Sequence, residues 1–105
     1  SCADNPSESE PCDWYQSKFS ATVTSIEFKE INGNNDSTFT VLLDFTAGSL
    51  SNELQDLGEI KNMEITKEKI KKNRIAINAT YTGTISDLKS GDCKTPIVAF
   101  DQRLH

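Results

Sequence analysis

The chain has 105 residues, of which 35% are hydrophobic and 26% charged, and its 11 basic against 16 acidic residues give a formal net charge of −5. A chain of this length fits one domain with a core of its own. The acidic balance argues against non-specific nucleic-acid binding, which depends on neutralising phosphates, and no stretch approaches the ~20 apolar residues of a membrane-spanning helix.

The first twelve residues are polar and acidic. Asp4, Glu8 and Glu10 stand there without a basic residue, and the segment holds no large apolar side chain. Such a composition offers nothing that could pack into a core. We therefore predict a flexible acidic tether over residues 1–12 and a single domain over residues 13–105.

Three cysteines divide the chain unevenly. Cys2 stands in the tether, whereas Cys12 and Cys93 bracket nearly all of the hydrophobic sequence. This predicts a Cys12–Cys93 disulfide, which would close a loop of about 80 residues and contribute about 4–5 kcal/mol in the chain-entropy model. Disulfides persist in oxidising compartments, so we expect an exported protein. The alternative is three thiols in a reduced protein, because a sequence does not fix pairing.

A cysteine that opens an acidic, serine-rich tether resembles the processing site of bacterial lipoproteins, in which a small residue, here Ser1, precedes the acylated cysteine. The run that follows resembles surface-exported lipoproteins of some Gram-negative groups. The resemblance implies that Cys2 is a lipid anchor and that the chain lies at the outer membrane or cell surface. The alternative is an ordinary terminus whose cysteine is free or paired with another molecule.

The first strands are predicted by alternation. Apolar residues alternate from Phe19 to Val23 and change phase at Ile26, which predicts a long strand with a bend or bulge near residues 24–25. The Asn- and Gly-rich residues 31–36 should reverse the chain. A second strand then follows over residues 38–46, with one face formed by Phe39, Val41, Leu43 and Phe45.

The middle of the chain mixes signals. Residues 47–58 are expected to be a connector with about one helical turn, and residues 59–65 a third strand. Thr66 is a candidate N-cap for a helix over Lys67–Lys72, with Ile65 and Ile70 as a hydrophobic staple and Asn73 as a left-handed cap. The lysines of this helix would lie near the negative, C-terminal end of its dipole and stabilise it. This local role is enough to explain why basic residues cluster here.

The last elements return to strands. Residues 75–85 alternate apolar and polar side chains and predict a long fourth strand that includes Asn78. A turn at residues 90–92 precedes Cys93, and Ile97–Phe100 should be a final strand with both faces at least partly covered.

The element order predicts an all-β domain with one short helix, arranged β-β-β-α-β-β as a five-stranded OB-like barrel. The fourth strand, Cys93 and the apolar strand after it resemble the C-terminal part of netrin-like domains, which are OB barrels. An immunoglobulin-like sandwich is the alternative, although it normally needs about seven strands. The predicted core consists of Phe19, Val23, Phe28, Val41, Leu43, Ile75, Ile77, Tyr81, Ile85 and Val98.

No motif for catalysis or for a cofactor or metal stands out. His105 is the only histidine, and the chain has no Cys-x-x-Cys, glycine-rich phosphate loop or Ca²⁺ loop. Its aspartates, Asp87 among them, are mostly expected in turns. We therefore predict a protein that is not an enzyme and has no cofactor, catalytic residue or metal site.

Candidate partner contacts come from two places in the sequence. Trp14 and Tyr15 follow Cys12 beside the acidic tether, and Lys69, Lys72 and Arg74 belong to the basic run. The alternative for the two aromatics is that they pack over an open end of the barrel.

These observations predict a non-enzymatic, lipid-anchored binding or structural module of the bacterial cell envelope. Its partner would be an unidentified protein or glycan, its membrane contact would run through the lipidated N-terminus only, and it would be a monomer without nucleic acid.

The alternative function is a netrin-like inhibitor of an extracellular protease. Metalloprotease inhibitors of that family ligate the target's metal through the amine of a disulfide-bonded N-terminal cysteine. Here Ser1 precedes Cys2 and a tether separates Cys2 from the domain, which departs from that pattern.

Overall fold

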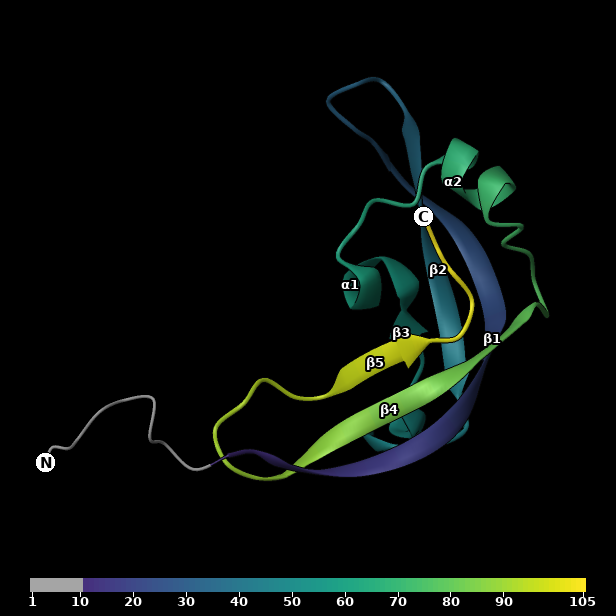
Figure 1. The fold of residues 1–105 in the computed structure, drawn as a ribbon. Helices are drawn as coiled ribbons and strands as arrows, with labels where there is room; N and C mark the ends of the chain where they lie inside the picture. The colour runs from purple at the N-terminus through teal and green to yellow at the C-terminus, as the bar shows by residue number, and fades with distance from the viewer. Residues whose placement is uncertain (1–10) are drawn as a thin grey trace, which may run out of the picture.

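The computed structural model describes residues 11–105, which form one antiparallel five-stranded sheet with the strand order β3-β2-β1-β4-β5 (Figure 1). The all-β prediction is confirmed, but the described residues include two short helices rather than one, and the sheet is not closed. Because all five strands belong to one sheet, the two-sheet immunoglobulin-like alternative is wrong. The elements are β1 (Asp13–Ile31), β2 (Ser37–Phe45), η2 (Ser49–Asn52), β3 (Gln55–Asp56), α1 (Leu57–Lys61), α2 (Lys67–Lys72), β4 (Thr80–Ser90) and β5 (Ile97–Phe100).

The long first strand carries the predicted irregularity. Val23 pairs with Leu43 and Ser25 with Leu42, so Thr24 is an extra residue on β1. A second register shift lies between Phe28 and Glu30. Each extra residue bends the strand and increases its twist. The predicted hairpin is therefore confirmed, together with its bulge.

The core lies on the concave side of the curved sheet, where α1 also lies (Figure 1). Seven of the ten predicted core residues are buried, and Val98 is half-buried. Phe28 and Ile77 contradict the prediction with exposed fractions of 60% and 56%. Phe28 lies beyond Thr22, where the pairing of β1 with β4 ends. Its one aromatic neighbour in the described part of the chain is Phe39, and the two rings pack edge-on. Ile77 precedes β4 in an irregular segment.

The predicted third strand over residues 59–65 is wrong. In this part of the chain the strand that pairs with β2 consists of Gln55 and Asp56 alone, and α1 begins directly after them. Beyond α1, Thr66 makes a single isolated bridge to Thr38 of β2. The Asp56 carboxylate accepts a hydrogen bond from the Gly58 amide at 2.9 Å, which caps the helix, and Asn62 ends it with φ 51°. Leu57 is fully buried, so the helix carries an apolar side chain into the core.

The second helix agrees with the sequence at its start and differs at its end. The Thr66 hydroxyl accepts from the Lys69 amide at 3.3 Å, which confirms the N-cap. The predicted left-handed cap at Asn73 is wrong, since its φ is −95° and Arg74 has the positive φ of 55°. The Asn73 side-chain amide instead donates to the Lys69 carbonyl oxygen at 2.8 Å. The Asn73 backbone amide donates to the same oxygen at 2.9 Å, so Asn73 closes the helix end with two bonds to one carbonyl.

The fourth strand begins later than predicted. Residues 75–79 approach β1 through two backbone bonds, in which Asn78 donates to Val23 and Val23 to Ala79. Asn78 is exposed with φ 75° and lies outside the strand, contrary to expectation. Asp87 lies within β4 rather than in a turn, and its carboxylate accepts from the Ser49 amide at 3.1 Å and from the Ser49 hydroxyl.

Candidate functional site

The predicted disulfide is present. Cys12 and Cys93 are joined, with a Cα–Cα distance of 6.1 Å. Gly91 lies against this bond with φ 103°, and a β-carbon there would come within 3.0 Å of the Cys12 sulfur. Glycine is therefore needed at this position for both its backbone conformation and the close approach. The disulfide ties the start of β1 to the loop between β4 and β5. Cys2 lies outside the described residues, so the proposed lipid anchor has no structural description.

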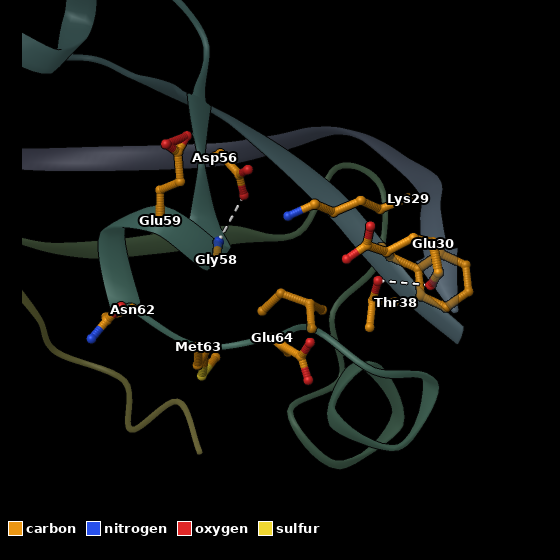
Figure 2. A pocket seen from close by; sticks show the side chains of 11 residues that line it. Lys29, Glu30, Thr38, Asp56, Gly58, Glu59, Asn62, Met63 and Glu64 are labelled. Atoms are coloured by element: carbon orange, nitrogen blue, oxygen red, sulfur yellow. Dashed lines mark hydrogen bonds between the residues drawn. The ribbon is translucent and has the colours of Figure 1, made fainter. Parts of the chain in front are cut away.

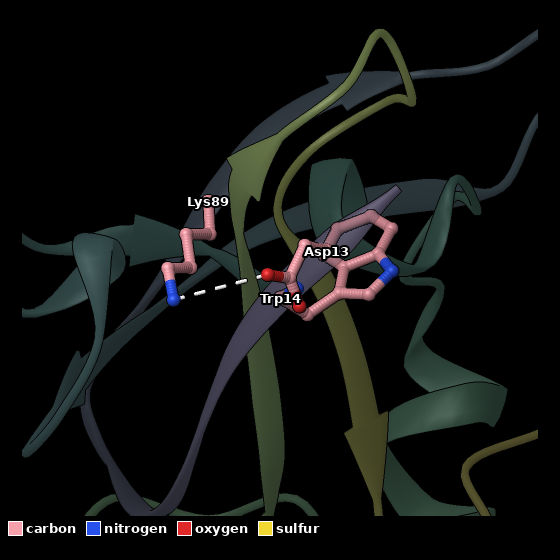
Figure 3. Close-up of polar contacts among 3 residues, drawn as sticks. All are labelled: Asp13, Trp14 and Lys89. Atoms are coloured by element: carbon pink, nitrogen blue, oxygen red, sulfur yellow. Dashed lines mark hydrogen bonds and ion pairs between the residues drawn. The ribbon is translucent and has the colours of Figure 1, made fainter. Parts of the chain in front are cut away.

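Trp14 and Tyr15 point to opposite faces of the sheet, because successive residues of a strand alternate. Trp14 is half-buried opposite Leu88. Tyr15 is 60% exposed, with the Lys89 ammonium 5.3 Å from its ring centroid. Lys89 also forms an exposed ion pair with Asp13 at 3.8 Å (Figure 3), which contributes little to stability.

The helix α2 lies at the other end of the sheet from the start of β1 (Figure 1), and Arg74 follows it by two residues. Lys69 and Lys72 belong to α2, and the Lys69 ammonium donates to the His105 carbonyl oxygen at 2.6 Å. The segment before α2 is tied to the β1–β2 hairpin through the Phe39 backbone amide, which donates to the Ile65 carbonyl. The structure therefore does not bring Trp14 and Tyr15 together with Lys69, Lys72 and Arg74.

One cavity lies between the β1–β2 hairpin and the segment around α1 (Figure 2). Its volume is about 310 Å³. Several polar groups of its wall already have hydrogen-bond partners within the protein. The Asp56 carboxylate caps α1, and the Thr38 hydroxyl donates to the Glu30 carbonyl at 2.8 Å. The Asn32 side-chain amide donates to the Glu64 carboxylate at 3.0 Å. Within residues 11–105, no cluster of three or more His, Cys, Asp or Glu side chains is placed to hold a metal ion. The lining residues are Lys29, Glu30, Thr38, Phe39, Asp56, Gly58, Glu59, Asn62, Met63, Glu64 and Ile65.

Two further cavities follow one another along β5, and the sequence did not indicate them. The first, of about 480 Å³, lies against Val98, and the second, of about 510 Å³, lies against Phe100. Each is also lined by α1, the first through Ile60 and the second through Lys61. We call this pair of cavities the β5–α1 groove. The sequence places β5 as an apolar strand, but the groove depends on a helix that the alternation did not predict.

Tyr81 is buried opposite Ala21, as its place on the apolar face of β4 predicted. Its ring packs edge-on against Phe100 with centroids 6.4 Å apart. Its hydroxyl has no hydrogen-bond partner within residues 11–105. Burial raises the pKa of Tyr81 above its ordinary value, because removal from water disfavours the phenolate.

Comparisons of the chain with protein-family models, with curated proteins and with solved structures found no match. In the described part of the chain, none of the helices has the length and apolar character needed to cross a membrane.

Proposed function

We propose that this chain is an exported, non-enzymatic binding or structural module, anchored to the bacterial cell envelope by acylation of Cys2. The observation that carries the proposal is the Cys12–Cys93 disulfide. A disulfide suits an oxidising compartment, and its pairing leaves Cys2 as the one cysteine available for another role. The acidic residues between Cys2 and Cys12 would then be a spacer between the membrane surface and the domain.

We further propose that the five-stranded sheet is an OB-like barrel, which is a more specific description than an open sheet. Two features support it. The bulge at Thr24 bends β1, which pairs with β4 before the bulge and with β2 on both sides of it. In addition, α1 follows the edge strand β3 directly and lines the groove beside the other edge strand, β5. The two edges thus lie near the same helix, which favours a sheet curled toward closure.

The protease-inhibitor alternative receives no support from the cysteine pairing. In that family the N-terminal cysteine that ligates the metal is itself disulfide-bonded. Here Cys93 is bonded to Cys12, so Cys2 has no partner cysteine left within the chain. We therefore propose the envelope module alone.

The test is acylation of Cys2 in a bacterial host that expresses the full coding sequence. We expect an intact mass that includes acyl chains and partition into the detergent phase of a Triton X-114 extract. Cys2→Ser should abolish both, whereas Ser1→Ala, which keeps a small residue before the cysteine, should leave both unchanged. An unmodified Cys2 in the chain with its native sequence would refute the anchor.

A further inference from the structure

We propose that the β5–α1 groove binds an extended, acidic peptide segment of a partner protein, which adds to the sheet as a strand beside β5. The inference deepens the proposed binding function and rests on it, but it does not depend on the lipid anchor. Three properties of the groove carry it: an unpaired strand edge, an apolar floor and cationic walls.

The strand edge is provided by Val98 and Phe100. The Asp101 amide donates to the Thr82 carbonyl at 2.9 Å, so the backbone groups of Asp101 point toward β4. In an antiparallel pair this direction alternates from residue to residue. The backbone groups of Ala99 therefore also point toward β4, and those of Val98 and Phe100 point away from the sheet. An extended peptide can bond to such groups, as in other cases of strand addition.

The apolar floor consists of side chains on both sides of this edge. Val98 and Phe100 are half-buried and pack against the core. Leu50, Ile60 and Pro96 line the first cavity beside Val98. Every second side chain of an added strand would face this floor, since side chains alternate along a strand. The groove therefore suits a segment with an apolar residue at alternate positions.

The walls favour a negatively charged partner. Lys94 lines the first cavity, and Lys61 and Arg103 line the second. The one ion pair within residues 11–105 is Lys89–Asp13, so none of these three cations has a side-chain carboxylate of that part of the chain within 4.0 Å. Two carboxylates also line the groove. The Glu59 side chain is exposed, and that of Asp101 accepts from the Thr82 hydroxyl at 2.8 Å. The groove has a positive balance on a chain whose net charge is −5.

The same charges disfavour a second copy of this chain as the occupant. In a two-fold pairing of β5 with β5, the interface would be the same patch on both copies. The cations of one groove would then face those of the other, and like charges held opposite one another oppose association. A heterologous acidic segment avoids this repulsion.

The experiment uses the disulfide-bonded chain and a short fluorescein-labelled peptide of alternating valine and glutamate, followed by fluorescence anisotropy. A peptide of alternating valine and lysine is the charge control. We expect the acidic peptide to bind at least about tenfold more tightly than the basic one. Amide shifts in a ¹H–¹⁵N spectrum should be confined to the residues that form the groove, which are Leu50, α1 with Asn62, residues 94–100 and residues 101–105.

Two variants separate the charge from the strand edge. The double substitution Lys61→Glu and Arg103→Glu should weaken binding by at least about tenfold, whereas Lys18→Glu, an exposed residue of β1, should change it by less than about twofold. Val98→Pro should abolish binding with the fold intact, because proline removes an amide that points away from the sheet.

Equal binding of the two peptides, or amide shifts outside the groove, would overturn the inference. So would a folded protein that binds neither peptide, or a concentration-dependent dimer that Lys61→Glu disrupts. These outcomes are independent of Cys2 acylation, so failure of the anchor and failure of the groove are distinguishable.

Discussion

The two halves of β1 both carry large apolar residues, but these residues differ in how far they are buried. In the inner half, residues 13–23, the side chains of Phe19, Ala21 and Val23 are buried. In the outer half, residues 24–31, Phe28 and Ile31 are mostly exposed. The inner half has β4 on one side, and from Ala21 it also pairs with β2 on the other, whereas the outer half pairs with β2 alone. Phe19 and Phe28 each have one neighbouring strand, but the Phe19 ring is covered by the rings of Phe45 and Phe100, whereas within residues 11–105 Phe28 has only Phe39 as an aromatic neighbour. Burial along this strand therefore depends on what packs over each side chain, and the hydrophobicity of its residues does not decide it.

The largest expected effect concerns the bond that holds the start of the inner half. The double substitution Cys12→Ser and Cys93→Ser should lower the free energy of unfolding by about 4–5 kcal/mol, because it releases the loop closed by the disulfide. The two cysteines are 81 positions apart. Urea unfolding without reductant measures the change, with Cys2→Ser as the control. Equal midpoints for the double variant and the control would show that the bond does not stabilise the fold.

A pair of truncations compares the packing around the two halves, one at Leu43 of β2 beside the inner half and one at Phe28 of the outer half. Leu43→Ala removes a fully buried side chain opposite Val23 and should cost about 2–5 kcal/mol. Phe28→Ala removes an exposed ring that packs edge-on against Phe39 and should cost about 0.5–1 kcal/mol. Thermal unfolding of both variants measures the difference. Similar losses would mean that the outer half is as well packed as the inner half.

Glycine substitutions extend the comparison to the turns. Gly48 has φ 79°, and a β-carbon there would lie 2.5 Å from a side-chain carbon of Ile85, which pairs with the inner half. Gly48→Ala should therefore cost about 1–3 kcal/mol. Gly33, in the turn beyond the outer half, has open space around it, so Gly33→Ala is the matched control and should change stability little. Urea unfolding of both variants measures the two losses of stability. A larger loss for Gly33→Ala than for Gly48→Ala would contradict the prediction.

The smallest effect is a pH dependence at Tyr81 of β4, which pairs with Ala21 of the inner half. Burial raises the pKa of Tyr81 above its unfolded value of 10.0, so the folded state holds this proton more tightly. Its contribution is fully present below pH 10 and is lost as the pH rises through the folded pKa. Tyr81→Phe removes the titration and the unpartnered hydroxyl, so its melting temperature should fall less between pH 9 and about pH 11. The exposed Tyr15→Phe is the control, and parallel curves for all three proteins would refute this assignment.

Local signals predicted local structure well. The change of phase between Val23 and Ile26 marks the bulge, and Thr66 marks the start of α2, because both depend on neighbouring residues. The β1 start at Asp13 was missed, since residues 15–18 show no apolar alternation. Had that start been predicted, alternation alone would have placed Trp14 and Tyr15 on opposite faces.

Non-local structure was predicted less well. Ile60, Met63 and Ile65 are compatible with a strand or a helix, and the outcome depends on the Asp56 cap and on burial of Leu57 by distant residues. The β5–α1 groove could not be found from the sequence for the same reason. It lies between elements far apart in the chain, and one of them was predicted as a different element.

The position of the disulfide also decides how the molecule would carry a mechanical load. If the chain is held through Cys2 and a partner pulls on β5, the force passes from Cys12 across the sulfur bridge to Cys93 and reaches β5 a few residues later. Nearly the whole domain lies between Cys12 and Cys93, so the force does not pass through it. A molecule connected in this way could transmit tension between the membrane and its partner without unzipping the β1–β4 hydrogen bonds.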